Sequence, residues 1–172
     1  MVRGRRNPLY FGLPVRLKTA RQNLSFDSVA LASGLTDGST VLHLERKRGH
    51  VPRLDTVERI AYALGLSPAF LAYGVESDGS QPTEGLRCEG VASRLRQTRA
   101  ARGLTMRALA RAAGLTDTAV RSTEAGTSMP SIATVEAFAT ALGVSPGWLG
   151  YGIGPMELPG RRRAAATPAP SP

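Results

Sequence analysis

Apolar residues recur every three or four positions along most of the chain, which is the spacing that gathers them on one side of an α-helix. No stretch shows the sustained alternation of apolar and polar residues that a half-buried β-strand requires. In the C-terminal part this pattern predicts a first helix from about Gly90 to Ala101 and a second helix that Thr105 caps. We therefore expect an all-α fold.

Turn residues divide the rest of the C-terminal part into three further helices. Gly114 is expected to end the second helix in the left-handed conformation, and a third helix is predicted from Thr118 to Ala125. A fourth helix should begin at Ser131. The pair Ser145 and Pro146, a capping residue followed by proline, predicts the start of a short fifth helix. The apolar side of the fourth helix consists of Ile132, Val135, Phe138, Ala139 and Leu142.

The same pattern occurs twice. The stretch from Leu24 to Gly74 returns from Leu104 to Gly152, with a shared Gly-Leu-Thr-Asp turn, a proline in the middle, a Leu-Gly break, a Ser-Pro pair and a terminal Tyr-Gly. A supersecondary unit that repeats in this way predicts two domains of similar fold, each with five helices.

The two copies differ in length within their turns. The offset between them is 80 residues at Leu24, 79 around Glu45 and 78 from Pro52 onward, so the first copy carries two extra residues, near Gly38 and within residues 47–51. Insertions are best tolerated in such turns. Before Leu24 the register stays open, because either Leu17 or Val15 can match Leu95.

Composition outside the repeats predicts the connecting segments. Residues 1–10 form a basic arm, residues 75–90 are acidic and rich in turn formers, and the end of the chain is rich in proline and alanine. The predicted organisation is a basic arm (1–10), a first domain (11–74), an acidic linker (75–90), a second domain (91–152) and a disordered tail (153–172).

Charge and cysteine content restrict the class of protein. The net charge of +9 and the pI near 10.9 favour an anionic partner, either nucleic acid or an acidic membrane surface. Cys88 is the only cysteine and lies in the predicted linker, so no intramolecular disulfide can form. No apolar run approaches the roughly 18 residues that span a bilayer, and the N-terminus lacks the apolar core of a secretory signal. We expect a soluble cytoplasmic protein.

The second and third helices of each copy carry the pattern of a helix-turn-helix. Ala110 is small where two helices would cross closely, Gly114 makes the turn, and Val120 would seat the third helix on the second. Ala30, Gly34 and Val41 repeat this pattern in the first copy. The second helix of such a motif, which is the third helix of each copy, fits the major groove of DNA.

At these residues the chain resembles the phage repressor and Cro-like family, also called the XRE helix-turn-helix family. The resemblance extends over RLRQTRAARGLTMRALARAAGLTDTAVRSTEAG and PSIATVEAFATALGVSPGWL, and both copies together cover most of residues 11 to 152. It implies two tandem five-helix domains like that of lambda repressor. It also implies sequence-specific binding of double-stranded DNA by a Cro/C1-type transcription regulator, with repression favoured over activation, at the nucleoid and without a cofactor.

The resemblance further implies which residues of the second copy face DNA. Bases would be read from the start and middle of the third helix, and the phosphate backbone would be met by the second helix and by the loop after the third. Arg121 is the best candidate for a specific contact, because its fork can bind both major-groove acceptors of guanine. The predicted set is Asp117, Thr118, Arg121 and Ser122 for bases, and Met106, Arg107 and Thr127 for the backbone.

The first copy departs from the family pattern at the matching positions. Gly38 is an extra residue where the third helix should start, and Leu42 is apolar at a position that is polar in most readers of DNA. Three interpretations stay open: this copy reads a different half-site, contacts thymine methyl groups and phosphates, or binds a protein. Its candidate residues are Ser39, Leu42, His43, Arg46, Lys47 and Arg48.

Basic residues concentrate at the start of the second copy. Six arginines and no acidic residue lie between Glu89 and Asp117, which favours phosphate contacts over a merely solvated helix face. These arginines are Arg94, Arg96, Arg99, Arg102, Arg107 and Arg111.

Other chemistry finds little support in the sequence. His43 and His50 are too few for a metal site, and the Gly-rich run from Gly150 to Gly154 follows a predicted helix instead of a strand, so it is not a phosphate loop. No nucleophile elbow or paired-carboxylate site is present, so we do not expect an enzyme.

Aromatic and leucine residues close each repeat, and they fit either the core of a domain or a dimer contact. These residues are Phe70, Leu71, Tyr73, Trp148, Leu149 and Tyr151. We predict a transcription regulator in which the two domains act as a covalent pseudo-dimer, and a homodimer of the whole chain stays open. The alternative is an antitoxin-like or adaptor protein in which one copy binds a protein and DNA binding is secondary.

Overall fold

The structure, a computed structural model, describes residues 8–46, 51–75 and 85–157. These residues are mostly helical, and within them extended backbone pairs only at two isolated bridges, so the all-α prediction is confirmed. The N-terminal half (residues 8–75) contains η1 (Leu9–Gly12), α1 (Leu13–Arg21), α2 (Phe26–Ala32), α3 (Ser39–Glu45), α4 (Leu54–Ala63) and α5 (Pro68–Tyr73). The C-terminal half (residues 85–157) contains η2 (Arg87–Gly90), α6 (Val91–Ala101), α7 (Met106–Ala113), α8 (Asp117–Glu124), α9 (Ile132–Leu142) and α10 (Pro146–Tyr151).

Side-chain caps set the starts of α7, α8 and α9 in the C-terminal half, as predicted. The hydroxyl of Thr105 accepts a hydrogen bond from the backbone N–H of Ala108, and Ser131 caps α9 in the same way. Each such cap satisfies a backbone donor that the helix itself cannot, and contributes about 1 kcal/mol. Ser145 precedes Pro146 at the start of α10 without a side-chain hydrogen bond. The predicted helices therefore agree with the observed ones to within one or two residues.

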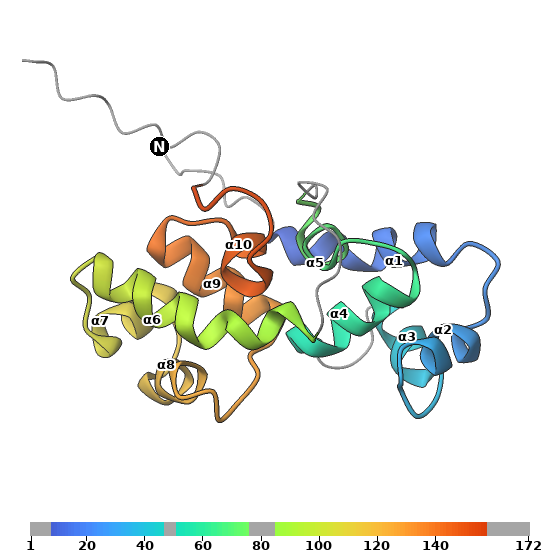
Figure 1. The fold of residues 1–172 in the computed structure, drawn as a ribbon, viewed down its shortest axis with the longest axis horizontal. Coiled ribbons are helices and arrows are strands. Elements are labelled where there is room, and N and C mark those ends of the chain that lie inside the picture. Colours follow the sequence, from blue (N-terminus) through green and yellow to red (C-terminus); the bar gives the residue numbers. More distant parts are fainter. Residues whose placement is uncertain (1–7, 47–50, 76–84, 158–172) are drawn as a thin grey trace, which may run out of the picture.

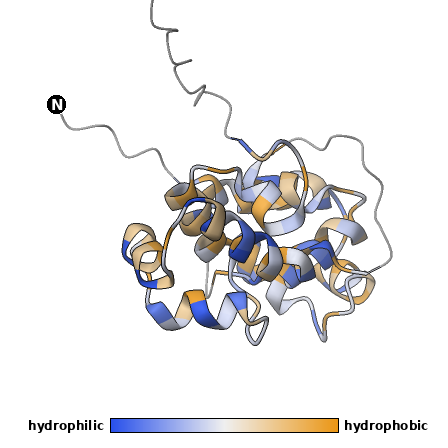
Figure 2. Ribbon diagram, turned by 60° about the vertical axis from the view of Figure 1, so that its left-hand side comes forward, coloured by the Kyte–Doolittle hydropathy of each residue, from blue (hydrophilic) through white to orange (hydrophobic). Residues whose placement is uncertain are grey.

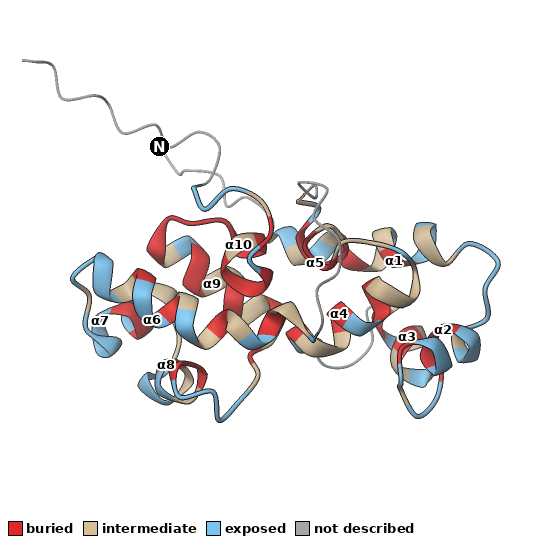
Figure 3. Ribbon diagram, in the orientation of Figure 1, coloured by how far each residue is buried: buried red, intermediate tan, exposed pale blue. Residues whose placement is uncertain are grey.

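The helices are amphipathic and bury one side each in a common core. Most of them carry both hydrophobic and hydrophilic residues (Figure 2), and the five residues predicted for the apolar side of α9 are all buried. Buried residues gather on α5, α9 and α10 in the middle of the molecule, whereas α2 and α7 near its two ends are largely exposed (Figure 3). The core is continuous from one half to the other.

The two halves meet along α5 and α10, which pack against each other in the centre of the molecule (Figure 1). The loops before α4 and α9 exchange backbone hydrogen bonds, since Leu54 donates to the carbonyl of Pro130 at 3.1 Å and Ile132 donates to the carbonyl of Pro52 at 3.0 Å. The residues expected to close each repeat thus lie where the halves join, and Tyr73, Leu71, Leu149 and Tyr151 are buried there.

Two glutamates fasten the halves reciprocally. Glu58 on α4 accepts hydrogen bonds from the backbone N–H groups of Arg87 at 2.7 Å and Cys88 at 2.9 Å, in η2 of the other half. Glu136 on α9 accepts them from Leu9 at 2.6 Å and Tyr10 at 3.1 Å, in η1. Each half therefore supplies the acceptor for the first turn of the other.

Parts of the predicted connecting segments are folded. Cys88, expected in an acidic linker, is fully buried in η2, and Ile153, expected at the start of a disordered tail, is also buried. Residues 156 and 157 pair with the backbone of residues 144 and 145, where the N–H of Ser145 donates to the carbonyl of Met156 at 2.8 Å. These corrections share one cause, because each segment satisfies its backbone polar groups on the other elements of the fold. The remainder of the predicted arm, linker and tail (1–7, 76–84 and 158–172) lies outside the described residues.

The open register at the start of the chain is decided by burial. Leu17 and Leu95 are both fully buried, whereas Val15 is 66% exposed. The neighbouring arginines agree, since the guanidinium of Arg16 donates to the carbonyls of Leu71 and Ala72 as that of Arg94 does to Leu149 and Gly150. Leu17 therefore matches Leu95, and the first copy is two residues shorter at the C-terminal end of its first helix, since α1 has 9 residues and α6 has 11.

Candidate nucleic-acid interface

In the C-terminal half, α7 and α8 form a helix-turn-helix. Gly114 ends α7 in the left-handed conformation, with φ of 67°, which glycine adopts without a steric penalty. The N–H of Leu115 then donates to the carbonyl of Ala110 at 2.9 Å, and Thr116 caps α8. Ala110 and Val120 are buried where the helices cross, as predicted. These contacts fix the direction of α8 relative to α7.

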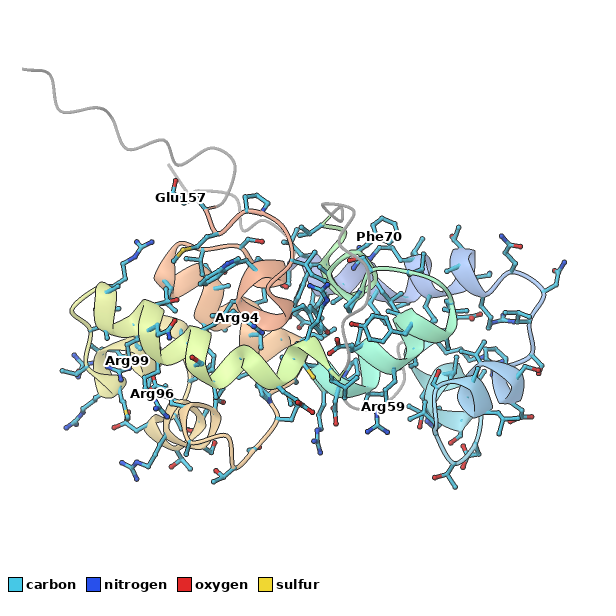
Figure 4. The ribbon with its side chains drawn as sticks, in the orientation of Figure 1. Arg59, Phe70, Arg94, Arg96, Arg99 and Glu157 are labelled. Atoms are coloured by element: carbon cyan, nitrogen blue, oxygen red, sulfur yellow. The ribbon has the colours of Figure 1, made fainter. Side chains whose placement is uncertain are left out.

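An ion pair fixes the rotation of α8 about its own axis. The guanidinium of Arg99 on α6 donates two parallel hydrogen bonds to the carboxylate of Glu124, at 2.6 and 2.9 Å, and a third to the carbonyl of Leu104 at 2.7 Å. Arg96 donates to the backbone carbonyl of Glu124. Both arginines lie between α6 and α8 (Figure 4). Because Val120 and Glu124 point inward, one turn apart, the opposite side of α8 faces solvent.

The predicted base-reading residues of α8 occupy that outer side. Asp117, Thr118 and Arg121 are exposed, and Ser122 is partly buried. Within the described part of the chain, Arg121 forms no hydrogen bond or ion pair, so its guanidinium is available to a ligand. The outer side of α8 therefore presents one cation flanked by short polar side chains.

The predicted backbone contacts lie on the helix before α8 and in the loop after it. Met106 and Arg107 are exposed at the start of α7. Thr127 is exposed in the loop after α8, but its hydroxyl donates to the carbonyl of Ser122 at 3.2 Å, and its N–H donates to the same carbonyl at 3.1 Å. Thr127 therefore ties this loop to the end of α8, and its hydroxyl proton is already used within the fold.

The prediction for the six arginines of this half is corrected in part. Arg94 and Arg99 are held by carbonyls and by Glu124, and Arg96 is engaged by the end of α8. Burial lowers the pKa of Arg94, whereas the hydrogen bonds to Glu124 raise the pKa of Arg99. Their physical role is to hold the fold. Of the six, Arg96, Arg102, Arg107 and Arg111 are exposed, and Arg107 and Arg111 lie one turn apart on α7.

The N-terminal half repeats the geometry of the motif. Gly34 follows α2 with φ of 66°, Val41 is buried as Val120 is, and Arg21 on α1 pairs with Glu45 at 2.8 Å as Arg99 pairs with Glu124. Of its predicted site residues, Ser39, His43 and Arg46 are exposed and Leu42 is partly buried. Lys47 and Arg48 lie outside the described residues.

Gly38 has a structural role that the sequence did not indicate. It is buried at the start of α3, and its N–H donates to the carboxylate of Asp27 at 2.9 Å. A Cβ at this position would lie 2.8 Å from the backbone nitrogen of Asp27, so only glycine allows α3 to approach α2 this closely. The carboxylate of Asp37 accepts a hydrogen bond from the N–H of Ser39 at 2.7 Å and starts the helix. The extra residue therefore preserves α3, but it offers no side chain to a ligand.

Hydrogen bonding at the start of α3 also affects an exposed carboxylate. Hydrogen bonds from Ser39 lower the pKa of Asp37, so this group stays ionised at neutral pH. The outer surface around α3 therefore carries two carboxylates, Asp27 and Asp37, close to its predicted reading residues.

The two third helices, α3 and α8, lie toward opposite ends of the molecule and on the same side of it, the lower side in Figure 1. The sequence could not predict this placement, because it depends on how α5 and α10 pack. The residues that fasten the halves, Glu58 and Glu136, were also missed. Their recurrence at the same 78-residue offset as the rest of the fourth helix was the available signal.

None of the helices in the described part of the chain is long and apolar enough to cross a membrane. Across residues 8–46, 51–75 and 85–157, no group of three or more His, Cys, Asp or Glu side chains is placed to hold a metal ion.

Comparison with known proteins identifies residues 95–149 as one helix-turn-helix domain of the HTH_3, or XRE, type. This match covers α7 and α8 with the helices on either side of them. No curated protein matches the chain.

Two solved structures resemble parts of the chain. An HTH_3 family transcriptional regulator from Vibrio cholerae is 29% identical, with a TM-score of 0.34, over 37% of this chain and 36% of that one. A hypothetical transcription factor NHTF from Neisseria is 27% identical, with a TM-score of 0.35, over 44% of this chain and 86% of that one. The chain thus spans about a third of the length of the Vibrio regulator.

Proposed function

We propose that this protein is a sequence-specific DNA-binding transcription regulator, with repression favoured, whose two halves act together as a covalent pseudo-dimer on a two-part DNA site. The observation that carries the proposal is the exposed outer side of α8, with Arg121 available, inside a domain of the HTH_3 type. That domain supports DNA binding and points away from an enzyme. A regulator of this kind would act at the nucleoid.

Charge supports double-stranded DNA as the ligand. Arg107 and Arg111 are exposed on α7, the helix that packs against α8, and they could meet phosphates while Arg121 meets a base edge. Phosphate contacts would position the domain, and a guanine bound by Arg121 would contribute about 1 to 3 kcal/mol of discrimination.

The contacts between the halves support the pseudo-dimer. The reciprocal hydrogen bonds of Glu58 and Glu136 and the continuous core hold the two third helices in one fixed relation. Binding by the second half then costs little further ordering, because its position relative to the first is already set. A repressor in which both halves bind DNA at once would occupy its site long enough to exclude polymerase.

A second function is favoured by one observation. Leu31 on the outer side of α2 is 82% exposed, which suits a protein partner better than DNA. In this alternative the N-terminal half binds a protein, as in an antitoxin or adaptor, and DNA binding is secondary.

The direct test is selection of DNA sequences by the full-length chain from a random pool, followed by footprinting of the selected site. We expect a two-part footprint with centres about 34 Å apart, or a multiple of that spacing, on one face of the duplex. Arg121→Ala should relax the preference at one base pair. Lys18→Ala is the matched control, because it also removes one positive charge, at an exposed position on α1. It should leave every base preference unchanged. Enrichment of no sequence would contradict the proposal, and a one-part footprint would favour the adaptor.

A further inference from the structure

The third helices of the two halves can be compared residue by residue. Val41 and Val120 are both fully buried, and one turn later Glu45 and Glu124 form ion pairs with arginines of α1 and α6. These two anchors fix both the axial position and the rotation of α3 and α8. Leu42 therefore occupies the position of Arg121, and His43 occupies that of Ser122.

The chemistry at these matched positions differs. Arg121 is exposed and carries five N–H donors in a rigid fork, which suits the O6 and N7 acceptors of guanine. Leu42 is partly buried and can neither donate nor accept a hydrogen bond. Its methyl groups can contact only apolar parts of a base edge, of which the C5-methyl group of thymine is the main one in the major groove.

The second helices differ in the same direction. Arg107 and Arg111 of α7 are matched by Asp27 and Leu31 of α2. Asp27 is occupied by the N–H of Gly38, and Leu31 is exposed to 82%. α2 of the N-terminal half therefore has no counterpart of the two arginines by which α7 would approach phosphates.

We propose that the two halves read different half-sites, so that the operator is not a palindrome and the chain binds it in one fixed orientation. Leu42 and Arg121 are the residues that determine the difference: the half-site under α8 contains a guanine at the position that Arg121 reaches, and the half-site under α3 contains thymine or tolerates several bases there. This inference rests on the proposed function, because it concerns which sequences the same two helices select.

Fixed orientation follows from the covalent link between unlike readers. Two identical subunits related by a twofold axis require a site with matching symmetry, and they bind it equally well in both directions. In this chain the anchoring residues of α3 and α8 match, but the residues that would read bases do not. Reversing the chain on the same DNA would therefore place Leu42 over guanine, and it would place Arg121 over a base that lacks the two acceptors of guanine. The reversed complex loses the bidentate contact.

The test uses the full-length chain and a pair of reciprocal substitutions. Sequences are selected from a random pool by the wild type, by Leu42→Arg and by Arg121→Leu. The wild type should enrich two unequal half-sites. Leu42→Arg should add a guanine preference at the matching position of the second half-site and bring the site toward an inverted repeat, and Arg121→Leu should remove the guanine from the first. Each change should alter the affinity for the affected base pair by about tenfold.

Leu31→Arg is the matched control. It makes the same chemical change on α2, where the side chain is exposed and is expected to meet phosphate, so it should raise affinity for all sequences alike. His43→Ser provides a second variant at an exposed position, and it should change the preference only in the half-site under α3. Circular dichroism and thermal unfolding of each variant establish that it is folded, and His43→Ser carries the test if Leu42→Arg does not fold.

Enrichment of a palindrome with identical half-sites by the wild type would overturn the inference, and so would an unchanged selected sequence after both Leu42→Arg and His43→Ser. A footprint confined to the half-site under α8 would overturn it as well. Failure of the proposed function is distinct, because then no sequence is enriched by any of the proteins.

Discussion

Tyr73 and Tyr151 lie against each other where the two halves join, with their ring centroids 6.4 Å apart, and each donates its hydroxyl to a backbone carbonyl of the opposite half. Tyr73 donates to Ile132 at 3.0 Å and Tyr151 donates to Leu54 at 3.3 Å. Burial raises the pKa of each phenol well above the ordinary value of a tyrosine, so both hydroxyls are protonated donors at neutral pH. The pair couples the fold of one half to that of the other.

Removal of either hydroxyl should therefore weaken the whole molecule. We expect Tyr73→Phe to lower the free energy of unfolding by about 1 kcal/mol, because the carbonyl of Ile132 loses a donor in a buried site. Urea unfolding followed by circular dichroism measures this change. Tyr10→Phe is the control, since among the described residues the Tyr10 hydroxyl forms no hydrogen bond. An equal loss in both variants would mean that the hydroxyl of Tyr73 does not stabilise the junction.

Glu58 should contribute more to the free energy of unfolding than Glu136, the other glutamate that joins the halves. It is fully buried and accepts from the hydroxyl of Tyr62 as well as from two backbone N–H groups, whereas Glu136 is partly exposed. Glu58→Ala leaves three donors without their acceptor, so we expect a loss of about 3 kcal/mol. Glu136→Ala should lose about 1 kcal/mol, because water can reach the freed N–H groups. Chemical unfolding of both variants checks the order, and a larger effect of Glu136→Ala would contradict it.

Cys88 offers a natural probe of separation between the halves. Burial, with a further contribution from Glu58, raises the pKa of its thiol well above the ordinary value, and its side chain is inaccessible. At pH 8 the thiolate is the form that attacks a thiol reagent, so the folded protein should react far more slowly than the unfolded chain. Glu58→Ala should accelerate the reaction and Arg121→Ala should not. Rapid labelling of the wild type would show that η2 opens readily.

The two parallel hydrogen bonds between Arg99 and Glu124 should stabilise the fold more than the opposite charges alone would. Arg99→Lys keeps the positive charge but loses the fork that binds Glu124 through two nitrogens and Leu104 through a third. We expect a loss of about 2 kcal/mol of stability. We also expect weaker DNA binding, because α8 is no longer held in rotation. Arg102→Lys, at an exposed position, is the control for the same substitution, and no difference between the two variants would contradict this role.

Phosphate contacts by α7 are tested through the salt dependence of DNA binding. Arg107→Ala should reduce the slope of log affinity against log salt concentration by about 0.9, the value for one phosphate contact in duplex DNA. Lys18→Ala, which removes a cation from an exposed position on α1 outside the helix-turn-helix, should not reduce it. Fluorescence anisotropy over a series of salt concentrations gives both slopes. Equal slopes for wild type and Arg107→Ala would place this arginine away from DNA.

Several features of the fold could be predicted because they depend on residues close together in sequence. The caps at Thr105 and Ser131, the left-handed glycine after α7 and the apolar side of α9 all follow from helical spacing and local hydrogen bonding. The repeat itself was visible for the same reason. The helix-turn-helix of residues 106–124 was therefore predicted correctly, including the exposed side of α8.

The site could be predicted only in part, because an arginine has the same local pattern whether it binds DNA or the protein itself. Arg94 and Arg99 were expected to meet phosphates, but they bind the end of α10 and Glu124, which are distant in sequence. Gly38 was interpreted only as an extra residue where the third helix should start, and the structure shows that it permits a close contact with Asp27. Nothing in the local sequence indicated these partners.

The sequence by itself predicted the ten short α-helices of the residues that the structure describes, the glycine turn between the second and third helices of each half, and the difference between the halves in the outer residues of the third helices. Helical periodicity and capping are local properties, so the sequence suffices for them. Only the tertiary structure decided that the halves share one core through α5 and α10, that Cys88 and Ile153 are buried, and that α3 and α8 lie on one side of the molecule. Those features depend on contacts between distant residues, whose hydrogen bonds form only when the helices pack.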